Sequence, residues 1–405
     1  MARTWSRRSR WWLVIVAALV MGTAGIYQFG WSSLRPALGT RAGVTETALG
    51  TAFTLFVVLQ TIAQFPAGWV RDRYGPRTPL LFGAACMTAG FVGLGLARST
   101  LGVYAAYAVG GVGVAAAYTV TVNTAVKWFT DRRGLATSVV TMSFSGVSVL
   151  AIPVIRTGAA SAFGRTMLGL GVLIGAVAVL GAVVLRDPGE VEDEGDESAD
   201  GPVYTWRETV RTWQFWLLYV VFAVLNGVGL MVIGKAVAYV SALSLPPHVG
   251  TASASLIALG DAAGIAVVGT LSDYLGRVRS LSVSLVLSGL SLGGAVLLGE
   301  TGFAWGFVAL VAATVFFRSP SFAIVPGIVG AYYGRSHSSE NYAALYTAKL
   351  FGGVFGGVVA SALVVLIGWS ASFALGGGLL LLAGVALAFL RPVRPSSGDR
   401  CDRGR

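Results

Sequence analysis

Apolar residues fill most of the chain in runs of about 20, separated by short polar segments. An α-helix rises about 1.5 Å per residue, so each run can cross a hydrocarbon layer roughly 30 Å thick. The runs show no two-residue alternation, which disfavours a β-barrel, and a helix satisfies its own backbone hydrogen bonds in lipid. The pattern predicts twelve spans, over residues 11–30, 47–69, 79–97, 101–126, 134–155, 166–185, 214–240, 250–271, 280–298, 304–330, 341–366 and 371–390.

One long polar segment interrupts these spans. Residues Asp187 to Asp200 are rich in acids and lack aromatic residues, so we expect this segment to be disordered. The predicted fold class is an all-α membrane protein, with twelve transmembrane helices as two six-helix pseudo-symmetric halves around a central cavity. The predicted parts are an N-terminal bundle (1–186), an acidic cytoplasmic linker (187–212), a C-terminal bundle (213–391) and a basic cytoplasmic tail (392–405).

Composition and charge agree with this class. The chain is 55% hydrophobic and 12% charged, about half the charge of a soluble protein. With the N-terminus in the cytoplasm, most of the 29 Lys and Arg residues fall in cytoplasmic segments, which predicts a cell-membrane protein with both termini inside. The net charge of +11 therefore indicates orientation and contact with anionic lipid headgroups, and not nucleic acid.

The residues that would hold a metal or a nucleotide are scarce. The two cysteines, Cys86 and Cys401, lie in different environments, and both histidines, His248 and His337, fall in predicted loops. The chain also lacks a Gly-x-x-x-x-Gly-Lys-[Ser/Thr] motif. We therefore expect no metal, no cofactor, no ATP-driven step and no enzymatic activity.

A polar motif occurs once in each half. The segment Gly68–Arg77 lies between spans 2 and 3, and its Gly, Asp and Gly recur 201 residues later between spans 8 and 9. Two copies in register indicate two parallel repeats. Each Asp could pair with an Arg or cap a helix, and each Gly could permit a tight turn. We expect a conformational latch, with simple topogenic basic loops as the alternative, from Gly68, Asp72, Arg73, Gly75, Arg77, Gly269, Asp273, Gly276 and Arg277.

Four ionisable residues lie inside the predicted spans. They are Lys235, Arg318, Lys349 and one acid, Asp261. A charge at this depth costs at least about 2.5–3.5 kcal/mol, so it is rare unless it has a role. The surplus of positive charge favours an anionic solute.

Local sequence indicates how three of these residues could act. Lys349 shares a helical face with Tyr346 and Gly353, so it should face protein or water and bind the anion, or else pair with Asp261 or with carbonyl groups. Arg318 precedes Pro320, which should break its helix; it could bind the anion or pair with Asp261. Asp261 itself is either a counter-ion or a proton carrier.

The motifs resemble those of the major facilitator superfamily. The segments Ala67–Arg77, Lys127–Ala136, Gly229–Gly234 and Tyr342–Gly357 resemble its oxalate/formate antiporter and monocarboxylate-transporter-like branch. The resemblance implies alternating access to a central site. It also implies that Lys349 binds a substrate carboxylate.

The resemblance also bears on the rest of the pocket. It implies pocket aromatics at Tyr27 and Tyr118, and the face shared with Lys349 adds Tyr346. The oxalate pattern has an arginine in span 8, whereas this chain has Gly264-Ile265 there. A dicarboxylate favours two fixed cations, so the substrate is a monocarboxylate or a dicarboxylate held by a rearranged pair. Lys235 is a further candidate ligand, or it extends outward along span 7.

The sequence thus predicts a secondary transporter of small organic anions that works by rocker-switch alternating access, as an antiporter or a proton symporter. The alternatives are a proton-coupled exporter of drugs or other metabolites and a transporter-like solute sensor. The expected partners are a small organic anion, the lipid bilayer and protons.

Overall fold

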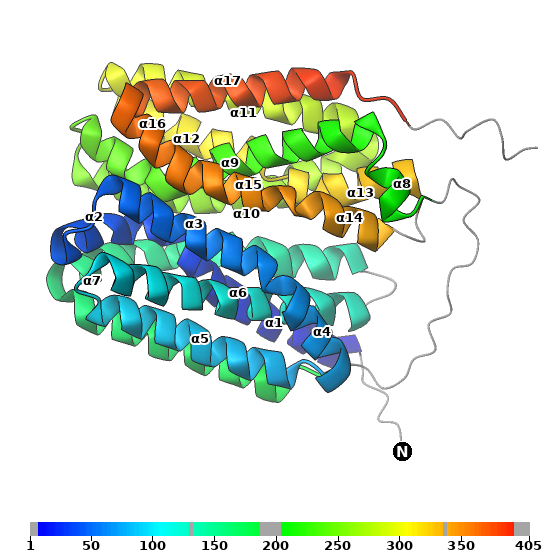
Figure 1. Ribbon diagram of the computed structural model, residues 1–405, viewed down its shortest axis with the longest axis horizontal. Helices are drawn as coiled ribbons and strands as arrows, with labels where there is room; N and C mark the ends of the chain where they lie inside the picture. Colours follow the sequence, from blue (N-terminus) through cyan, green and yellow to red (C-terminus); the bar gives the residue numbers. More distant parts are fainter. Residues whose placement is uncertain (1–6, 129–132, 187–203, 335–337, 393–405) are drawn as a thin grey trace, which may run out of the picture.

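The computed structural model describes residues 7–128, 133–186, 204–334 and 338–392, and these residues form helices and no strand (Figure 1). The helices lie roughly parallel to the long axis. The first part of the chain forms one bundle and the second part forms another beside it (Figure 1). This arrangement confirms the predicted fold class.

The first bundle follows the order of the predicted spans. Its helices are α1 (Arg7–Phe29), α2 (Trp31–Ala42), α3 (Glu46–Ile62), α4 (Gln64–Tyr74), α5 (Arg77–Leu96), α6 (Thr100–Trp128) and α7 (Arg133–Val184). α7 has 52 residues, about 78 Å if straight, and its backbone breaks at Ala162 (φ −150°, ψ 61°). That break separates two membrane crossings.

The second bundle begins after the short helix α8 (Trp206–Thr209), which lies in the predicted linker. Two of its crossings are interrupted. Its elements are α9 (Trp213–Ala242), α10 (Pro247–Leu275), α11 (Arg277–Glu300), α12 (Ala304–Arg318), α13 (Ser321–Tyr333), α14 (Ser338–Tyr346), α15 (Ala348–Val354), the π-helical turn η1 (Phe355–Val359), α16 (Ala360–Ile367) and α17 (Trp369–Ala388). Within the described ranges, 11 segments are long and apolar enough to span a membrane, and counting α7 as two crossings gives twelve.

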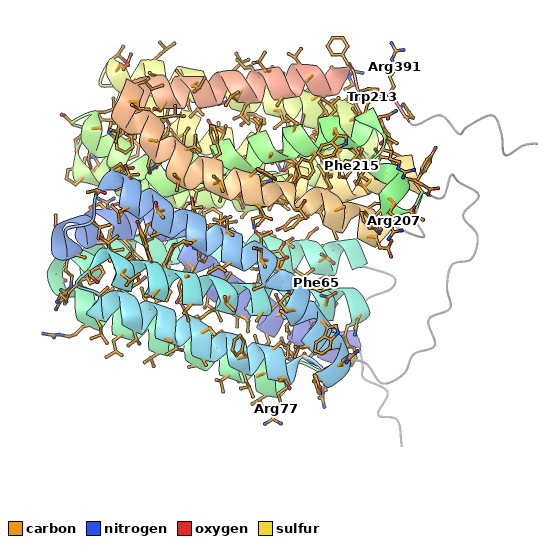
Figure 2. All side chains as sticks on the ribbon, viewed as in Figure 1. Phe65, Arg77, Arg207, Trp213, Phe215 and Arg391 are labelled. Carbon is orange, nitrogen blue, oxygen red and sulfur yellow. The ribbon has the colours of Figure 1, made fainter. Side chains whose placement is uncertain are left out.

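The two ends of the molecule differ. We call the end where α1 begins and α17 finishes the terminal end, and the opposite end, which carries α2 and the α16–α17 turn, the distal end (Figure 1). Figure 2 shows Arg207, Arg391 and Trp213 at the terminal end. Basic and aromatic side chains of this kind are typical of a membrane–water boundary.

Both copies of the repeated motif form a tight corner. Gly75 separates α4 from α5 with φ of +74°, and Gly276 separates α10 from α11 with φ of +89°. A side chain is disfavoured at these φ values, so glycine is required at both corners. The expected tight turns are therefore present at the second glycine of each copy, whereas Gly68 and Gly269 lie within α4 and α10.

α2 lies in a stretch that the sequence pattern places in a loop. Trp31, Leu34 and Leu38 recur on one face of α2 and are buried, with Trp31 stacked on Tyr107 at a centroid distance of 4.2 Å. Ser32 accepts a hydrogen bond from the backbone N–H of Val237 in the second bundle (3.0 Å). This helix is too short to span lipid, so the hydropathy pattern does not reveal it.

Glycines hold the two bundles together towards the distal end. A Cβ atom added to Gly357 would lie 2.0 Å from Thr54 Oγ1 and 2.5 Å from the carbonyl oxygen of Gly50. Thr54 Oγ1 donates to the Gly353 carbonyl (3.0 Å) and accepts from the Val358 N–H (3.1 Å). α3 and the π-helical turn therefore approach at backbone distance, as small residues allow in membrane proteins.

We predict that Gly357→Ala lowers the thermal unfolding temperature of the detergent-solubilised protein. Its Cβ meets backbone that must move, and overpacking of this kind costs about 1–3 kcal/mol. The matched control is Gly378→Ala in α17, where an added Cβ meets no atom within 4 Å. Equal changes in the two variants would contradict close packing at Gly357.

Candidate functional site

A cavity of about 370 Å³ lies between the two bundles. The first bundle contributes side chains of α1, α6 and α7, and the second contributes side chains of α9, α10, α12, α13, α14 and α15. The lining extends from mid-depth residues towards the terminal end, where Ser138 and Tyr342 lie near the starts of α7 and α14. Its volume is in the range of small-molecule sites.

Lys349 lies in the wall of this cavity, with 5% of its surface exposed. Its Nζ donates to the hydroxyl of Tyr346 (3.3 Å) and lies 5.5 Å from the centre of the same ring. Among the described residues, no carboxylate forms an ion pair with Lys349. The expected direction of the lysine, towards a cavity and away from lipid, agrees with the structure.

Glycines in α15 and in the π-helical turn after it allow neighbouring helices to approach closely. A Cβ on Gly353 would lie 2.6 Å from Val57 in α3, and one on Gly356 would lie 2.7 Å from Leu230 in α9. Both bundles therefore pack closely around the lysine helix, as the predicted glycine face requires.

Arg318 and Asp261 form a buried ion pair in the cavity wall. Arg318 Nη2 lies 2.9 Å from Asp261 Oδ1, and the two residues are 2% and 6% exposed. The hydroxyl of Ser319 also donates to Asp261 Oδ1. The structure thus adopts the pairing that the sequence leaves open for Arg318.

The break between α12 and α13 lies at the cavity wall, next to Arg318. α12 ends at Arg318, Pro320 follows, and α13 begins at Ser321. Gly229 of α9 provides the space, because a Cβ there would lie 2.4 Å from Arg318 Cδ. The aliphatic part of the arginine therefore lies directly against the α9 backbone.

The wall at Gly264-Ile265 is apolar. Ile265 lines the cavity, and a Cβ at Gly264 would lie 2.0 Å from the carbonyl oxygen of Phe316. The arginine that the oxalate pattern places in span 8 is therefore missing, and no described residue of α10 supplies another cation to the cavity wall. The second cation of the cavity comes from Arg318.

The predicted pocket tyrosines separate into two groups. Tyr118 and Tyr346 line the cavity, together with Tyr342. Tyr27 instead lies fully buried in the first bundle, where its hydroxyl donates to the Met87 carbonyl and its ring contacts Phe91 at a centroid distance of 4.2 Å. The structure does not bring Tyr27 to the cavity, because that face of α1 packs on α5 and α6.

Lys235 also lies outside the cavity, in a charged cluster towards the distal end. Its Nζ is 2.7 Å from Glu46 Oε1 and 2.6 Å from Ser361 Oγ. Arg35 pairs with the other oxygen of Glu46 and donates to the Gly234 carbonyl (3.0 Å). We call Arg35, Glu46, Lys235 and Ser361 the distal cluster; it joins α2 and α3 of the first bundle to α9 and α16 of the second.

Several residues of the cavity wall and of the distal cluster were not predicted from the sequence. Glu46 precedes the predicted span 47–69 by one residue and Arg35 falls in the preceding loop, so the pattern predicts neither in the protein interior. Ser319 and Asn226 carry no charge, and only the folded structure shows their positions beside the cavity. A signal was available for Glu46, as the acid at the start of an apolar run.

The expected latch is described in part. Arg73 lies over the Trp69 ring (4.3 Å), Arg77 is exposed, and Arg277 Nη1 donates to the Gly327 carbonyl of α13 (3.0 Å). The side chains of Asp72 and Asp273 lie outside the described residues, as does most of the predicted linker. Paired salt bridges at these corners stay a prediction.

Comparison with known proteins agrees with the helical architecture. The sequence model described as Major Facilitator Superfamily matches residues 13–244 and 223–403. A solved bacterial homologue of the human lysosomal transporter Spinster, in an inward-facing and unoccupied conformation, superposes with a TM-score of 0.68 at 15% identity, covering 95% of this chain and 96% of its own. This chain belongs to the major facilitator superfamily and is therefore a multi-pass membrane protein of a transporter family.

Two known proteins are similar to this chain over most of its length. The oxalate:formate antiporter of Oxalobacter formigenes is 31% identical over 371 residues, covering 90% of this chain and 87% of the antiporter. The MFS-type transporter YhjX of Escherichia coli (strain K12), whose name describes it as uncharacterized, is 26% identical over 84% of this chain and 85% of its own.

Proposed function

We propose that the chain is a secondary transporter of small organic carboxylates, which alternates between openings at the two ends as an antiporter or a proton symporter. The observation that carries the proposal is Lys349, a buried ammonium group in the cavity wall that no described carboxylate neutralises. An unpaired charge in this environment is costly, and a substrate carboxylate would offset that cost. The similarity to an oxalate:formate antiporter supports this class of substrate.

We further propose that the terminal end faces the cytoplasm. Basic residues such as Arg207 and Arg391 gather there, as the positive-inside rule requires. The cavity lining extends towards this end and the distal cluster closes the other, which corresponds to an inward-facing conformation.

A proton-coupled exporter of other metabolites is less well supported. Like proton symport of a carboxylate, it needs an acid that is free to take up a proton. Asp261 is the one acid in the described cavity lining, and Arg318 and Ser319 already bind its Oδ1. The same observation favours antiport within the proposed function.

Exchange should be faster than net transport, and this prediction tests the proposal. Closing an empty cavity buries the Lys349 charge without an anion, whereas closing a loaded cavity buries a neutral pair. In proteoliposomes loaded with a labelled monocarboxylate, we expect carboxylate on the opposite side to accelerate efflux by about tenfold or more.

Neutral amides provide the matched control for this experiment. Lactamide and acetamide have the shapes of lactate and acetate without the charge, so they should neither be transported nor accelerate efflux. Equal efflux with and without carboxylate on the opposite side would contradict exchange. Transport of the amides at the rate of the acids would contradict an anion site.

A further inference from the structure

In the Arg318–Asp261 pair, the protein itself supplies a carboxylate to a cation of the cavity wall. Asp261 Oδ1 takes the position that one oxygen of a bound carboxylate would take against Arg318 Nη2, at 2.9 Å, and Ser319 holds the same oxygen. The Nε of Arg318 is buried and lacks a hydrogen-bond partner among the described residues. The charge of the guanidinium group is therefore neutralised, but its Nε–H has no hydrogen-bond acceptor among the described residues.

The charge of the cavity follows from three residues. Lys349 and Arg318 are positive and Asp261 is negative, so the described lining carries one net positive charge. A bound monoanion brings the closed cavity to neutrality. A bound dianion leaves one uncompensated negative charge, which is expensive to enclose away from water.

We infer that Asp261 sets the charge selectivity of the site: it occupies Arg318 as an internal carboxylate, so the cavity accepts monocarboxylates and rejects dicarboxylates. This inference rests on the proposed function. Lys349 then binds the single substrate carboxylate, and Arg318 is a second carboxylate site that the protein itself fills. Without the Asp261 charge, the same cavity would carry two positive charges and would match a dicarboxylate of similar size.

The test uses two substrates that differ in charge and hardly in shape. Oxamate is the monoamide of oxalate, so at neutral pH it carries one negative charge where oxalate carries two. Uptake of both labelled compounds is measured in proteoliposomes for the wild type and for Asp261→Asn. We expect the wild type to favour oxamate and Asp261→Asn to shift the oxalate-to-oxamate ratio by about tenfold or more towards oxalate.

A double variant separates charge from local structure. Asp261→Asn/Arg318→Gln removes one charge of each sign and restores a net charge of +1, so its ratio should return towards the wild-type value. Glu300→Gln, which removes an exposed acid at the end of α11, is the control for a general change of surface charge. A shift that persists in the double variant would contradict the charge count.

The outcomes distinguish this inference from the proposed function. If the wild type transports neither compound and no other carboxylate, the proposed function fails. If the wild type transports carboxylates but takes up oxalate as readily as oxamate, the selectivity inference alone is overturned, and no variant is needed for that result. An unchanged ratio in folded Asp261→Asn would also overturn it.

Discussion

Carboxylate transport should fall to background in Lys349→Gln, while the protein stays folded. Lys349 is the cavity cation that no described carboxylate neutralises, so its replacement removes the charge that attracts and holds the substrate. A hydrogen bond to a charged group contributes about 1.5–3 kcal/mol, which corresponds to about 10- to 150-fold in affinity. Uptake of a labelled monocarboxylate in proteoliposomes measures the effect.

Stability distinguishes a ligand from a structural lysine. A buried ammonium group without a carboxylate partner is costly, so Lys349→Gln should leave the thermal unfolding temperature unchanged or raise it. The chain offers a matched control in Lys127→Gln, because Lys127 is exposed at the terminal end of α6. Full transport by Lys349→Gln, or a large loss of its stability, would contradict the role of Lys349 as a substrate ligand.

Glu46→Gln should shift the protein towards the conformation that is open at the distal end. Glu46 forms ion pairs with both Lys235 and Arg35, and the Lys235–Glu46 pair crosses between the bundles. Breaking a buried ion pair costs about 3–5 kcal/mol, and we expect the lower value because the Glu46 side chain keeps 25% of its exposure. A change of about 3 kcal/mol alters the ratio of the two conformations by about 150-fold.

Distances between spin labels across the distal end measure this shift. Thr47 in α3 and Ser241 in α9 are exposed and belong to different bundles, so cysteines at these positions can carry the labels once Cys86 and Cys401 are replaced by serine. Glu46→Gln should populate a longer distance, whereas Glu300→Gln should leave the distribution as in the wild type. The same distribution in all three proteins would show that the distal cluster does not hold this end closed.

The direction of Lys349 and the helix break after Arg318 could be predicted from the sequence alone. Lys349 could be assigned because a lysine within an apolar run is costly, and the spacing of Tyr346 and Gly353 fixes the direction of its face. The break after Arg318 follows from Pro320, which cannot continue a helix. Both inferences depend on one helix at a time.

The neighbours of Tyr27 and Lys235 could not be predicted in this way. Each of these two residues lies within a span, as expected, but Tyr27 points into the first bundle and Lys235 points towards Glu46. Helical periodicity gives the direction of a side chain relative to its own helix and does not say which neighbour lies there. Glu46 shows the same limit, because its partner Lys235 is 189 residues away in the sequence.

Hydropathy, local periodicity and composition are enough to predict the membrane class, the twelve spans, the two repeats and the surplus of positive charge in the interior. Which charges share a cavity depends on how the helices pack, and the sequence pattern does not show it. The tertiary structure pairs Arg318 with Asp261, leaves Lys349 facing open space and moves Lys235 to the distal cluster. The energy of a charge in a low-dielectric interior depends mainly on its partners within a few ångströms. Helix packing brings those partners together from distant parts of the chain.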